Sequence, residues 1–470
     1  MPRQPDIYPV KDDVKTRIGW IFATSLFLGF GGCSSGNFAA TPGVSVGQVA
    51  DRNDRVSAAG GGSGFHVLYN FQDGTDGAVP VTGLIADTRG NLYGTATNDG
   101  GAGSCNVHCG SIFELSPPTS KDGRWNFTIL YDFNGGKDGG LPAGNLTFGP
   151  DGSLFGTTNV GGGGYAKFGA GVLFQLKPSR HRWIEHVLHR FGRGNDGRNP
   201  HGGLVADNKG NLYGTTVNGG KYFGGTVYEL SSSGTETVLY NFSGGEDGGL
   251  PIAGLTIDRA GRLYGTTEYG GYFDYYCQDG CGTVFEISPL IGSGDSWKYS
   301  VIHEFVGGDP GDGALPVDPL LLDRKGNLYG TTFVSQVYGG GTAFELTPAR
   351  HKPWSETVLY RFPAYRGDAA NPQAGFISDT AGNLYATSQN GGPAFKGDAF
   401  KLIPPATSGG AWTDAILYTF VSNKHGAIYP ATNLVFGAAG LLYGTTPYGG
   451  TGNCLFIKTK GCGTVFQVSP

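Results

Sequence analysis

Residues 210–216 have the sequence Gly-Asn-Leu-Tyr-Gly-Thr-Thr, and close copies of this stretch return along the whole chain. The copies number seven and are marked by the aromatic residues Tyr93, Phe155, Tyr213, Tyr264, Tyr329, Tyr385 and Tyr443. Their spacing of 51 to 65 residues is typical of repeat arrays and propellers. The sequence therefore predicts one fold made from seven similar units.

The composition indicates many short strands joined by tight turns. The chain of 470 residues contains 86 glycines and 26 prolines, with 13% aromatic and only 15% charged residues. Because the glycines recur at fixed places beside apolar residues, we interpret them as turn residues and predict an all-β protein. The net charge of −5 and the absence of a long basic run argue against a nucleic-acid partner.

The N-terminal segment has the pattern of an export signal. Lys11, Lys15 and Arg17 precede an apolar run over residues 18–30, which is too short to span a bilayer comfortably. Small residues then lead to Cys33, as in a bacterial lipoprotein signal, although Phe30 replaces the usual aliphatic residue. We expect an export signal in residues 1–33, a flexible tether in 34–64, and either lipidation of Cys33 with attachment to a membrane or ordinary cleavage nearby.

Three close pairs of cysteines remain. Local disulfides are expected in an exported protein, and a zinc site built from two thiolate pairs is the alternative. The candidate pairs are Cys105 with Cys109, Cys277 with Cys281, and Cys454 with Cys462.

Each repeat reads as four strands, which we name A, B, C and D. In the fourth repeat they cover residues 254–258, 263–267, 283–287 and 297–305. The A strands are nearly all apolar, which predicts an innermost strand covered on both faces. An Asp-x-x-Gly-Asn connection predicts a tight A–B turn, and the glycine after the B-strand aromatic suits a bulge or a close backbone approach. The tryptophan that opens five D strands is expected to be a hydrophobic cover.

The two ends of the chain are complementary. A lone D-type strand at residues 66–71 precedes the first A strand, and the last repeat stops after a C strand at residues 464–468. Pairing the two ends completes seven blades of four antiparallel strands and leaves that sheet without an open edge. We therefore predict a monomeric, seven-bladed β-propeller over residues 65–470, rather than a linear array.

The repeat resembles that of the bacterial GloVer-containing proteins, a family with a choice of anchors. The resemblance rests on the Gly-Asn-Leu-Tyr-Gly-Thr-Thr core, the following Gly-Gly and the Gly-Thr-Val-Phe-Glu-Leu strand, and it covers roughly residues 65–470. It implies an exported, surface-associated propeller and brings no catalytic residues.

The B–C and D–A loops should share one face of the propeller, because successive connections of a meander alternate between its ends. Five D–A loops carry Asp-Gly, and their carboxylates either surround the mouth of the channel or simply make the turn, the latter being favoured by the near-sevenfold repetition. These residues are Asp76, Asp138, Asp196, Asp247 and Asp312. Calcium is conceivable there, but the Asp-x-Asp-x-Asp-Gly spacing of a dedicated loop is missing.

Aromatic residues in the B–C loops break the symmetry. They are candidates for binding a ligand, because aromatic rings beside polar groups bind sugars or extended peptides, although any single ring is more often packed onto its blade. The candidates are Tyr222 and Phe223 in the third repeat and Tyr269, Tyr272, Phe273, Tyr275 and Tyr276 in the fourth. The three carboxylates of Asp196, Asp247 and Asp312 join this set.

Catalytic motifs are missing from the sequence: there is no Gly-x-Ser-x-Gly, His-Glu-x-x-His or phosphate-binding loop. We therefore expect no cofactor and no dedicated metal, and favour an exported, envelope-associated propeller that binds a glycan or an extracellular protein. A polysaccharide-active enzyme using two mouth carboxylates and a structural spacer without a ligand are the alternatives.

Overall fold

The computed structural model describes residues 64–72, 76–98, 109–120, 123–163, 169–180, 182–273, 277–290, 297–307, 311–335, 339–349, 353–363, 369–407, 409–421, 426–454 and 459–470. The chain divides into two units, Met1–Gly62 and Ser63–Pro470. The first lies outside the described residues, as do Cys33, Cys105, Tyr275 and Tyr276. All that follows concerns the second unit.

Almost all regular structure in the described part is β-strand. Blade 1 contains β2 (Ile85–Ala86), β3 (Leu92–Ala96), β4 (Ser111–Ser116) and β5 (Asn126–Asp132). Blade 2 contains β6 (Gly140–Phe148), β7 (Leu154–Val160), β8 (Val172–Ser179) and β9 (Arg182–Arg190). Blade 3 contains β10 (Arg198–Pro200), β11 (Val205–Ala206), β12 (Leu212–Asn218), β13 (Thr226–Leu230) and β14 (Glu236–Asn241). Blades 4 and 5 contain β15 (Thr256–Ile257), β16 (Leu263–Thr267), β17 (Thr283–Pro289) and β18 (Trp297–Glu304); and β19 (Leu321–Leu322), β20 (Leu328–Thr332), β21 (Gly339–Thr347) and β22 (Ser355–Pro363).

Blades 6 and 7 complete the set. They contain β23 (Ala369–Pro372), β24 (Ile377–Ser378), β25 (Leu384–Gly391), β26 (Asp398–Ile403) and β27 (Thr413–Thr419); and β29 (Val435–Phe436), β30 (Leu442–Thr446), β34 (Thr464–Val468) and β1 (Phe65–Asn70). Two small ribbons pair β28 (Ala427–Ile428) with β31 (Tyr448–Gly449) and β32 (Asn453–Cys454) with β33 (Thr459–Lys460), and a 3-10 turn, η2, covers Ala438–Gly440.

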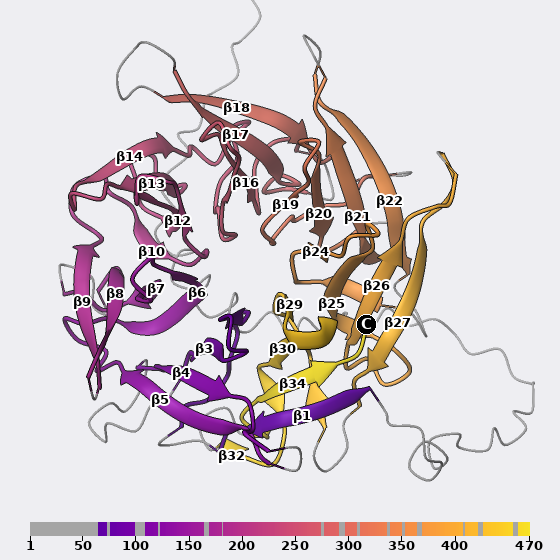
Figure 1. The fold of residues 1–470 in the computed structure, drawn as a ribbon. Helices are drawn as coiled ribbons and strands as arrows, with labels where there is room; N and C mark the ends of the chain where they lie inside the picture. Colours follow the sequence, from indigo (N-terminus) through magenta and orange to yellow (C-terminus); the bar gives the residue numbers. More distant parts are fainter. Residues whose placement is uncertain are drawn as a thin grey trace, which may run out of the picture. The chain divides into compact units, whose positions relative to one another are not determined.

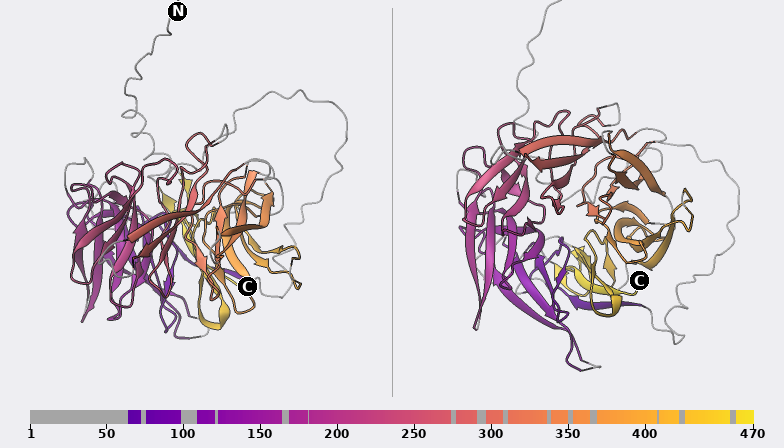
Figure 2. Two further views of the ribbon diagram at one scale, coloured as in Figure 1. Left: turned by 90° about the horizontal axis from the view of Figure 1, so that it is seen from above. Right: turned by 45° about the horizontal axis from the view of Figure 1, so that its top comes forward.

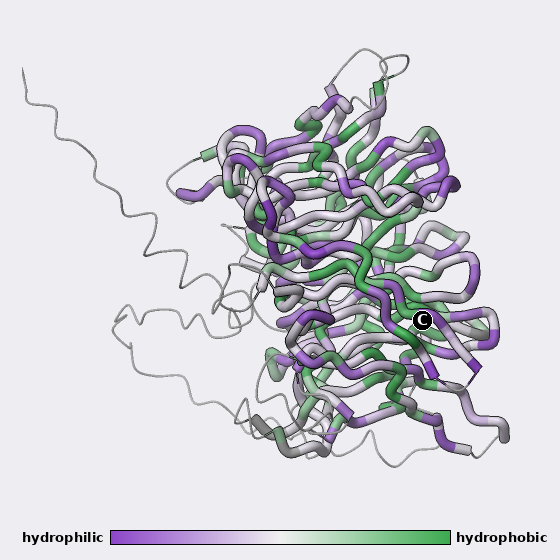
Figure 3. The backbone as a smooth tube through the Cα atoms, turned by 90° about the vertical axis from the view of Figure 1, so that its left-hand side faces the viewer, coloured by the Kyte–Doolittle hydropathy of each residue, from purple (hydrophilic) through white to green (hydrophobic). Residues whose placement is uncertain are grey.

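The blades form a ring, with the A strands toward its centre and the D strands at its rim (Figure 1). Seen edge-on, the strands run between two faces that carry the connecting loops (Figure 2, left). Many of the turns at these edges are hydrophilic, whereas apolar segments run through the strands (Figure 3). The predicted seven-bladed, all-β propeller is confirmed.

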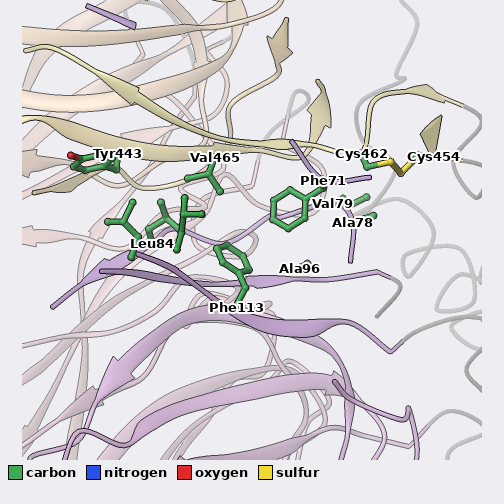
Figure 4. Close-up of a cluster of buried hydrophobic side chains, with 12 residues drawn as sticks. Phe71, Ala78, Val79, Leu84, Ala96, Phe113, Tyr443, Cys454, Cys462 and Val465 are labelled. Atoms are coloured by element: carbon green, nitrogen blue, oxygen red, sulfur yellow. A yellow bond between two sulfur atoms is a disulfide. The ribbon is translucent and has the colours of Figure 1, made fainter. Parts of the chain in front are cut away.

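The ring closes through the two ends of the chain, as the sequence predicts. Strand β1 pairs antiparallel with β34, with Phe65 opposite Val468 and Asn70 opposite Thr464. A buried cluster then joins this closing blade to blade 1, and it includes Phe71, Val79, Phe113, Tyr443 and Val465 (Figure 4). Closure therefore rests on main-chain pairing and on apolar packing together.

The A strands differ from the prediction in one respect. They are innermost, but β2, β11, β15, β19, β24 and β29 are only two residues long, and their side chains are half-buried or exposed rather than covered on both faces. The buried apolar residue is the one just before each strand, such as Leu84 or Leu255. The inner strands of a propeller converge on its axis, so these short strands face the central channel instead of a second layer of structure.

The A–B turn is held by its aspartate. Asp207 accepts hydrogen bonds from the main chain of Lys209 and Asn211, at 2.8 and 2.9 Å, and from the Asn211 side chain at 3.0 Å. The Tyr213 hydroxyl donates to the same carboxylate at 3.2 Å. The turns at Asp87, Asp323 and Asp379 repeat this pattern. The repeated Asp, Asn and Tyr are thus one turn-forming unit.

The glycine of the B strand permits a close approach and is not a bulge. Gly265 pairs with Phe285 in a regular register, and a methyl group on Gly265 would lie 2.5 Å from Phe285 Cζ. The sixth repeat alone has alanine, Ala386, opposite Phe400. The bulges occur instead between the C and D strands, where the register skips one apolar residue of each D strand.

Aromatic contacts connect each blade to the next. A phenylalanine at the end of each D strand packs on the C-strand aromatic of the next blade, with ring centroids 5.0 to 5.4 Å apart. The seven pairs are Phe71–Phe113, Phe133–Phe174, Phe191–Tyr228, Phe242–Phe285, Phe305–Phe344, Phe362–Phe400 and Phe420–Phe466. Trp125, Trp297 and Trp354 pack on the B-strand tyrosine of the preceding blade, which supports their interpretation as hydrophobic cover.

Removal of the closing strand should destabilise the whole ring. Truncation through residue 71 exposes the edge of β34 and removes Phe71 from the cluster shared with blade 1. We expect the melting temperature to fall by roughly 10 °C or more. Truncation through residue 62 is the matched control and should leave the melt unchanged. Equal melting of the two truncated proteins would contradict closure by β1.

Substitution of the B-strand glycine tests the close approach. Gly265→Ala places a methyl group against Phe285 and Leu255, and should lower the free energy of unfolding by about 1 to 3 kcal/mol. Gly136→Ala is the control, since that glycine is exposed and its nearest neighbour would be 3.9 Å from the new carbon. Urea denaturation measures the free energy of unfolding of both variants. An equally small decrease for the two would show that the packing around Gly265 is loose.

Candidate functional site

The B–C and D–A loops meet on one face, as the alternation of connections predicts. Short antiparallel bridges join Ala78 to Asn98, Gly249 to Tyr269 and Ala314 to Val334, each linking a D–A loop to the start of the following B–C connection. The main-chain N–H of Leu250 also donates to Gly224 O at 2.9 Å. The D–A loop around Asp247 is therefore bonded to the B–C loops of blades 3 and 4 on its two sides.

Four aromatic candidates are exposed on this face. Tyr222 and Phe223 in blade 3 are 52% and 73% exposed, and Tyr272 and Phe273 in blade 4 are 45% and 46% exposed. Tyr269 differs, because it is half-buried beside Glu268 and burial raises the pKa of its hydroxyl. The structure thus brings two exposed aromatic pairs to loops that flank one D–A loop, and places Tyr269 at their base.

The D–A carboxylates are engaged in their own turns. Asp247 accepts from the main-chain N–H of Ser243 at 2.9 Å and from the Tyr240 hydroxyl at 3.0 Å. Asp138 repeats the arrangement with Asn134 and Tyr131. These hydrogen bonds are those of a turn into the next A strand, so they support the turn interpretation of the repeated Asp-Gly unit.

Histidine replaces the tyrosine at two of these turns. His189 Nε2 lies 3.1 Å from Asp196 Oδ2, and His303 Nε2 lies 3.0 Å from Asp312 Oδ2. Main-chain N–H groups of Gly192 and Val306 donate to the other oxygen of each carboxylate. Asp196 and Asp312 therefore differ from Asp247 in having an imidazole partner instead of a phenol.

A glutamate of the next blade faces each His–Asp pair. Glu236 in β14 interacts electrostatically with His189 and Asp196. Glu356 in β22 interacts in the same way with His303 and Asp312, and also with Arg361 of its own strand. Burial raises the pKa of each glutamate to about 7; in both cases the histidine opposes the rise and the aspartate adds to it. Oε1 of each has no hydrogen-bond partner in the part of the chain that the structure describes.

These histidines and glutamates are not among the candidate site residues predicted from the sequence. A signal exists, because His189 and His303 occupy the D-strand position held by Tyr69, Tyr131 and Tyr240 in other repeats. The glutamate near each histidine, however, comes from the following blade, roughly fifty residues later in the chain. Inspection of one repeat at a time does not bring the two positions together.

Disulfides occur where the spacing of the cysteines predicts them. Cys277 is bonded to Cys281, and Cys454 to Cys462. Cys109 is also disulfide-bonded, whereas its predicted partner Cys105 lies outside the described residues. Within the described ranges no group of three histidine, cysteine or acidic side chains is arranged to hold a metal ion. Oxidised sulfurs are not zinc ligands, so the disulfide interpretation holds for these pairs.

No helix within the described ranges has both the length and the apolar character needed to cross a membrane. The fold and its seven sequence copies define a tandem-repeat β-propeller. The model of the Gloeobacter/Verrucomicrobia repeat matches residues 55–192, 163–348 and 276–470, so the chain belongs to this family. The resemblance stated from the repeat sequence is thereby confirmed.

Several solved structures are similar to the chain at low sequence identity. The extracellular domain of a protein assigned to a one-component system of B. thetaiotaomicron is 11% identical, with a TM-score of 0.46; the match covers 85% of this chain but only 39% of that one. A gluconolactonase of Xanthomonas campestris is 14% identical over 70% of this chain and 84% of its own, with a TM-score of 0.37. A Thermus thermophilus protein assigned as a glucose dehydrogenase-type oxidoreductase is 17% identical over 70% and 96%, also with a TM-score of 0.37. No curated protein matches the chain.

The glutamates between blades should make stability depend on pH. Their pKa in the folded chain, about 7, lies above the ordinary 4.5, so the protonated forms favour folding. This contribution is complete below pH 4.5, is lost as the pH rises toward 7, and does not change above it.

The double variant Glu236→Gln, Glu356→Gln should therefore be more stable than the parent protein at pH 8, by roughly 1 to 2 kcal/mol after allowance for solvent screening of half-buried groups. At pH 4.5 the two proteins should match. Glu246→Gln, at an exposed position of a D–A loop, is the control and should change neither value. Urea denaturation at both pH values decides the matter, and a gain of equal size at pH 4.5 and pH 8 would count against the titration of these glutamates.

Proposed function

We propose that this protein is an exported, envelope-associated binding propeller whose ligand is a glycan. The ligand lies on the face that carries the B–C and D–A loops, against the exposed pairs Tyr222–Phe223 and Tyr272–Phe273. Export is supported by the N-terminal signal pattern and by the disulfides of the propeller. Attachment through a lipid on Cys33 is part of the proposal.

The exposure of the aromatic side chains is the observation that carries the proposal. Large apolar rings that stay uncovered on loops cost hydration free energy in the free protein, and rings of this kind are typical of sites that stack sugars. Here two such pairs occur on neighbouring B–C loops, and the intervening D–A loop is bonded to both loops. A shared scaffold holds the two pairs at a fixed separation, which lowers the entropic cost of binding an extended ligand.

A glycan is favoured over a catalytic substrate by the state of the carboxylates. Asp196 and Asp247 accept hydrogen bonds from the main chain of their own turns, so their oxygens are already engaged as turn acceptors. An acid and base for glycoside hydrolysis must flank one scissile bond. The repeated turn chemistry supports a structural role for these residues, with binding assigned to the aromatics.

Substitution of the exposed pairs tests the proposal. The purified propeller is screened against an array of neutral and acidic glycans, and the best binder is titrated by calorimetry. Tyr222→Ala with Phe223→Ala, or Tyr272→Ala with Phe273→Ala, should weaken binding about tenfold or more, because stacking on a ring contributes on the order of 1 to 2 kcal/mol.

Leu290→Ala is the matched control, since Leu290 is an exposed apolar residue just after β17, at the opposite, C–D end of its blade. It should leave the affinity unchanged. Failure of the array to show any glycan bound would reject the glycan as ligand and would favour a protein partner or a structural spacer. Equal effects of the loop variants and Leu290→Ala would reject the assignment of the face.

A further inference from the structure

The B–C loops of blades 3 and 6 repeat one arrangement that the other described loops do not show. They run from residues 218 to 225 and from 390 to 397, with the sequences Asn-Gly-Gly-Lys-Tyr-Phe-Gly-Gly and Asn-Gly-Gly-Pro-Ala-Phe-Lys-Gly. Each carries a phenylalanine at its sixth position. Phe223 is 73% exposed and Phe395 is 46% exposed.

Both phenylalanines have left-handed backbone conformation. The φ angles are 67° at Phe223 and 51° at Phe395. A residue with a bulky side chain rarely adopts this conformation, and where it persists it commonly marks a site with a function. The loops therefore hold an exposed ring in a strained place where a glycine would fit more easily.

A lysine lies over a tyrosine ring beside each phenylalanine. Lys221 Nζ is 4.9 Å from the centroid of Tyr222, and Lys396 Nζ is 4.4 Å from the centroid of Tyr429. Lys396 Nζ also donates a hydrogen bond to the Tyr429 hydroxyl. Tyr429 comes from the next D–A loop, whose main-chain N–H donates to Lys396 O at 2.8 Å. Lys396 is thus positioned by the ring of Tyr429, and the main chain of Tyr429 is itself bonded to the B–C loop of blade 6.

Neither lysine is paired with an acidic residue of the described ranges. The ion pairs within the described ranges involve Asp87, Asp196, Asp258 and Asp312, and none includes Lys221 or Lys396. An ammonium group has three donors, so each lysine retains donors for a ligand while the ring faces it from one side. Lys221 is exposed and Lys396 is half-buried, and in each loop the cation beside an exposed phenylalanine ring matches a sugar that carries a carboxylate.

We propose that blades 3 and 6 carry two equivalent subsites for an acidic sugar unit. This inference rests on the proposed glycan function and specifies its ligand class. The blade 3 subsite is Lys221, Tyr222 and Phe223, and the blade 6 subsite is Phe395, Lys396 and Tyr429. In each, the ammonium group binds the carboxylate and the phenylalanine contacts the apolar face of the sugar ring. The net charge of −5 disfavours a dense polyanion, so the ligand is a glycan with isolated carboxylates.

The two subsites act separately. Strands β12 and β13 lie on the opposite side of the ring from β25 and β26 (Figure 1). A short oligosaccharide reaches one of them at a time, whereas a long chain that contacts both gains avidity. Two molecules of a short ligand should therefore bind each propeller.

The test uses short oligosaccharides of glucuronoxylan with a single glucuronate, and the same oligosaccharides after reduction of the carboxyl group to the alcohol. Calorimetry of the full chain should show two sites that prefer the acidic form about tenfold or more, the size expected of charge-assisted hydrogen bonds. Lys221→Gln and Lys396→Gln should each reduce the stoichiometry for the acidic form from two to one. The double variant should bind both forms as weakly as the parent binds the reduced one.

Arginine at either position should retain the preference, and Lys209→Gln, in an A–B turn, is the control and should change nothing. If the parent binds the reduced and acidic forms equally, the acidic subsites are rejected although the glycan function stands. If the lysine variants keep the preference, Lys221 and Lys396 are not its source and the assignment is overturned. If neither form binds, the subsites are rejected, and a positive result on the wider array would still preserve the glycan function.

Discussion

The contact that the rest of this propeller depends on is the packing of one phenylalanine on another across the boundary between blades. The phenylalanine at the end of each D strand contacts the C-strand aromatic of the following blade, and in all blades but the sixth that ring covers the glycine of its own B strand. A methyl group on Gly265, for example, would lie 2.5 Å from Phe285 Cζ. The contact between the two aromatic rings recurs at all seven boundaries, with Ala386 in place of the glycine in blade 6, so it fixes the spacing and inclination of every blade, and the ring can close only if each boundary is similar.

Most of the fold could be predicted from the sequence because the local chemistry is repeated. The Asp-x-x-Gly-Asn turn, the alternating strands and the complementary ends of the chain lead directly to seven blades and to the pairing of β1 with β34. Two features were less accessible. The bulges are at the apolar residue before the tyrosine or histidine of each D strand, where nothing but ordinary strand residues occurs. The A strands look fully buried by composition, but their residues converge on the axis, and apolarity alone does not distinguish the two environments.

The residues of the candidate site could be predicted from the sequence only where they differ from the corresponding residues of other repeats. Tyr222, Phe223, Tyr272 and Phe273 stand out in the sequence as paired aromatic residues in B–C loops that differ between repeats, and they are exposed in the structure. The aspartates of the D–A loops stand out equally, yet their hydrogen bonds are those of a turn. The electrostatic interaction of Glu236 with the His189–Asp196 pair could not be derived, since it depends on which positions of two successive D strands lie near one another. That relation is a property of the ring and not of the repeat.

Backbone strain separates scaffold from function in the same way. In each of the seven D–A loops the residue before proline has a positive φ, including the β-branched Val79 at 58°. In six of these loops its N–H donates to a carbonyl of the preceding B–C loop, as Leu250 does to Gly224 and Leu315 to Cys281. Such strain, present in all seven blades, is offset by the bonds that attach one blade to the next. Among the described B–C loops, Phe223 and Phe395 have a positive φ and an exposed ring, and each directly precedes a carbonyl, that of Gly224 or Lys396, that accepts a bond from the next D–A loop. A repeat protein must keep its shared positions for the ring, so the residues that serve a ligand are found where strain and exposure occur in some repeats and not in others.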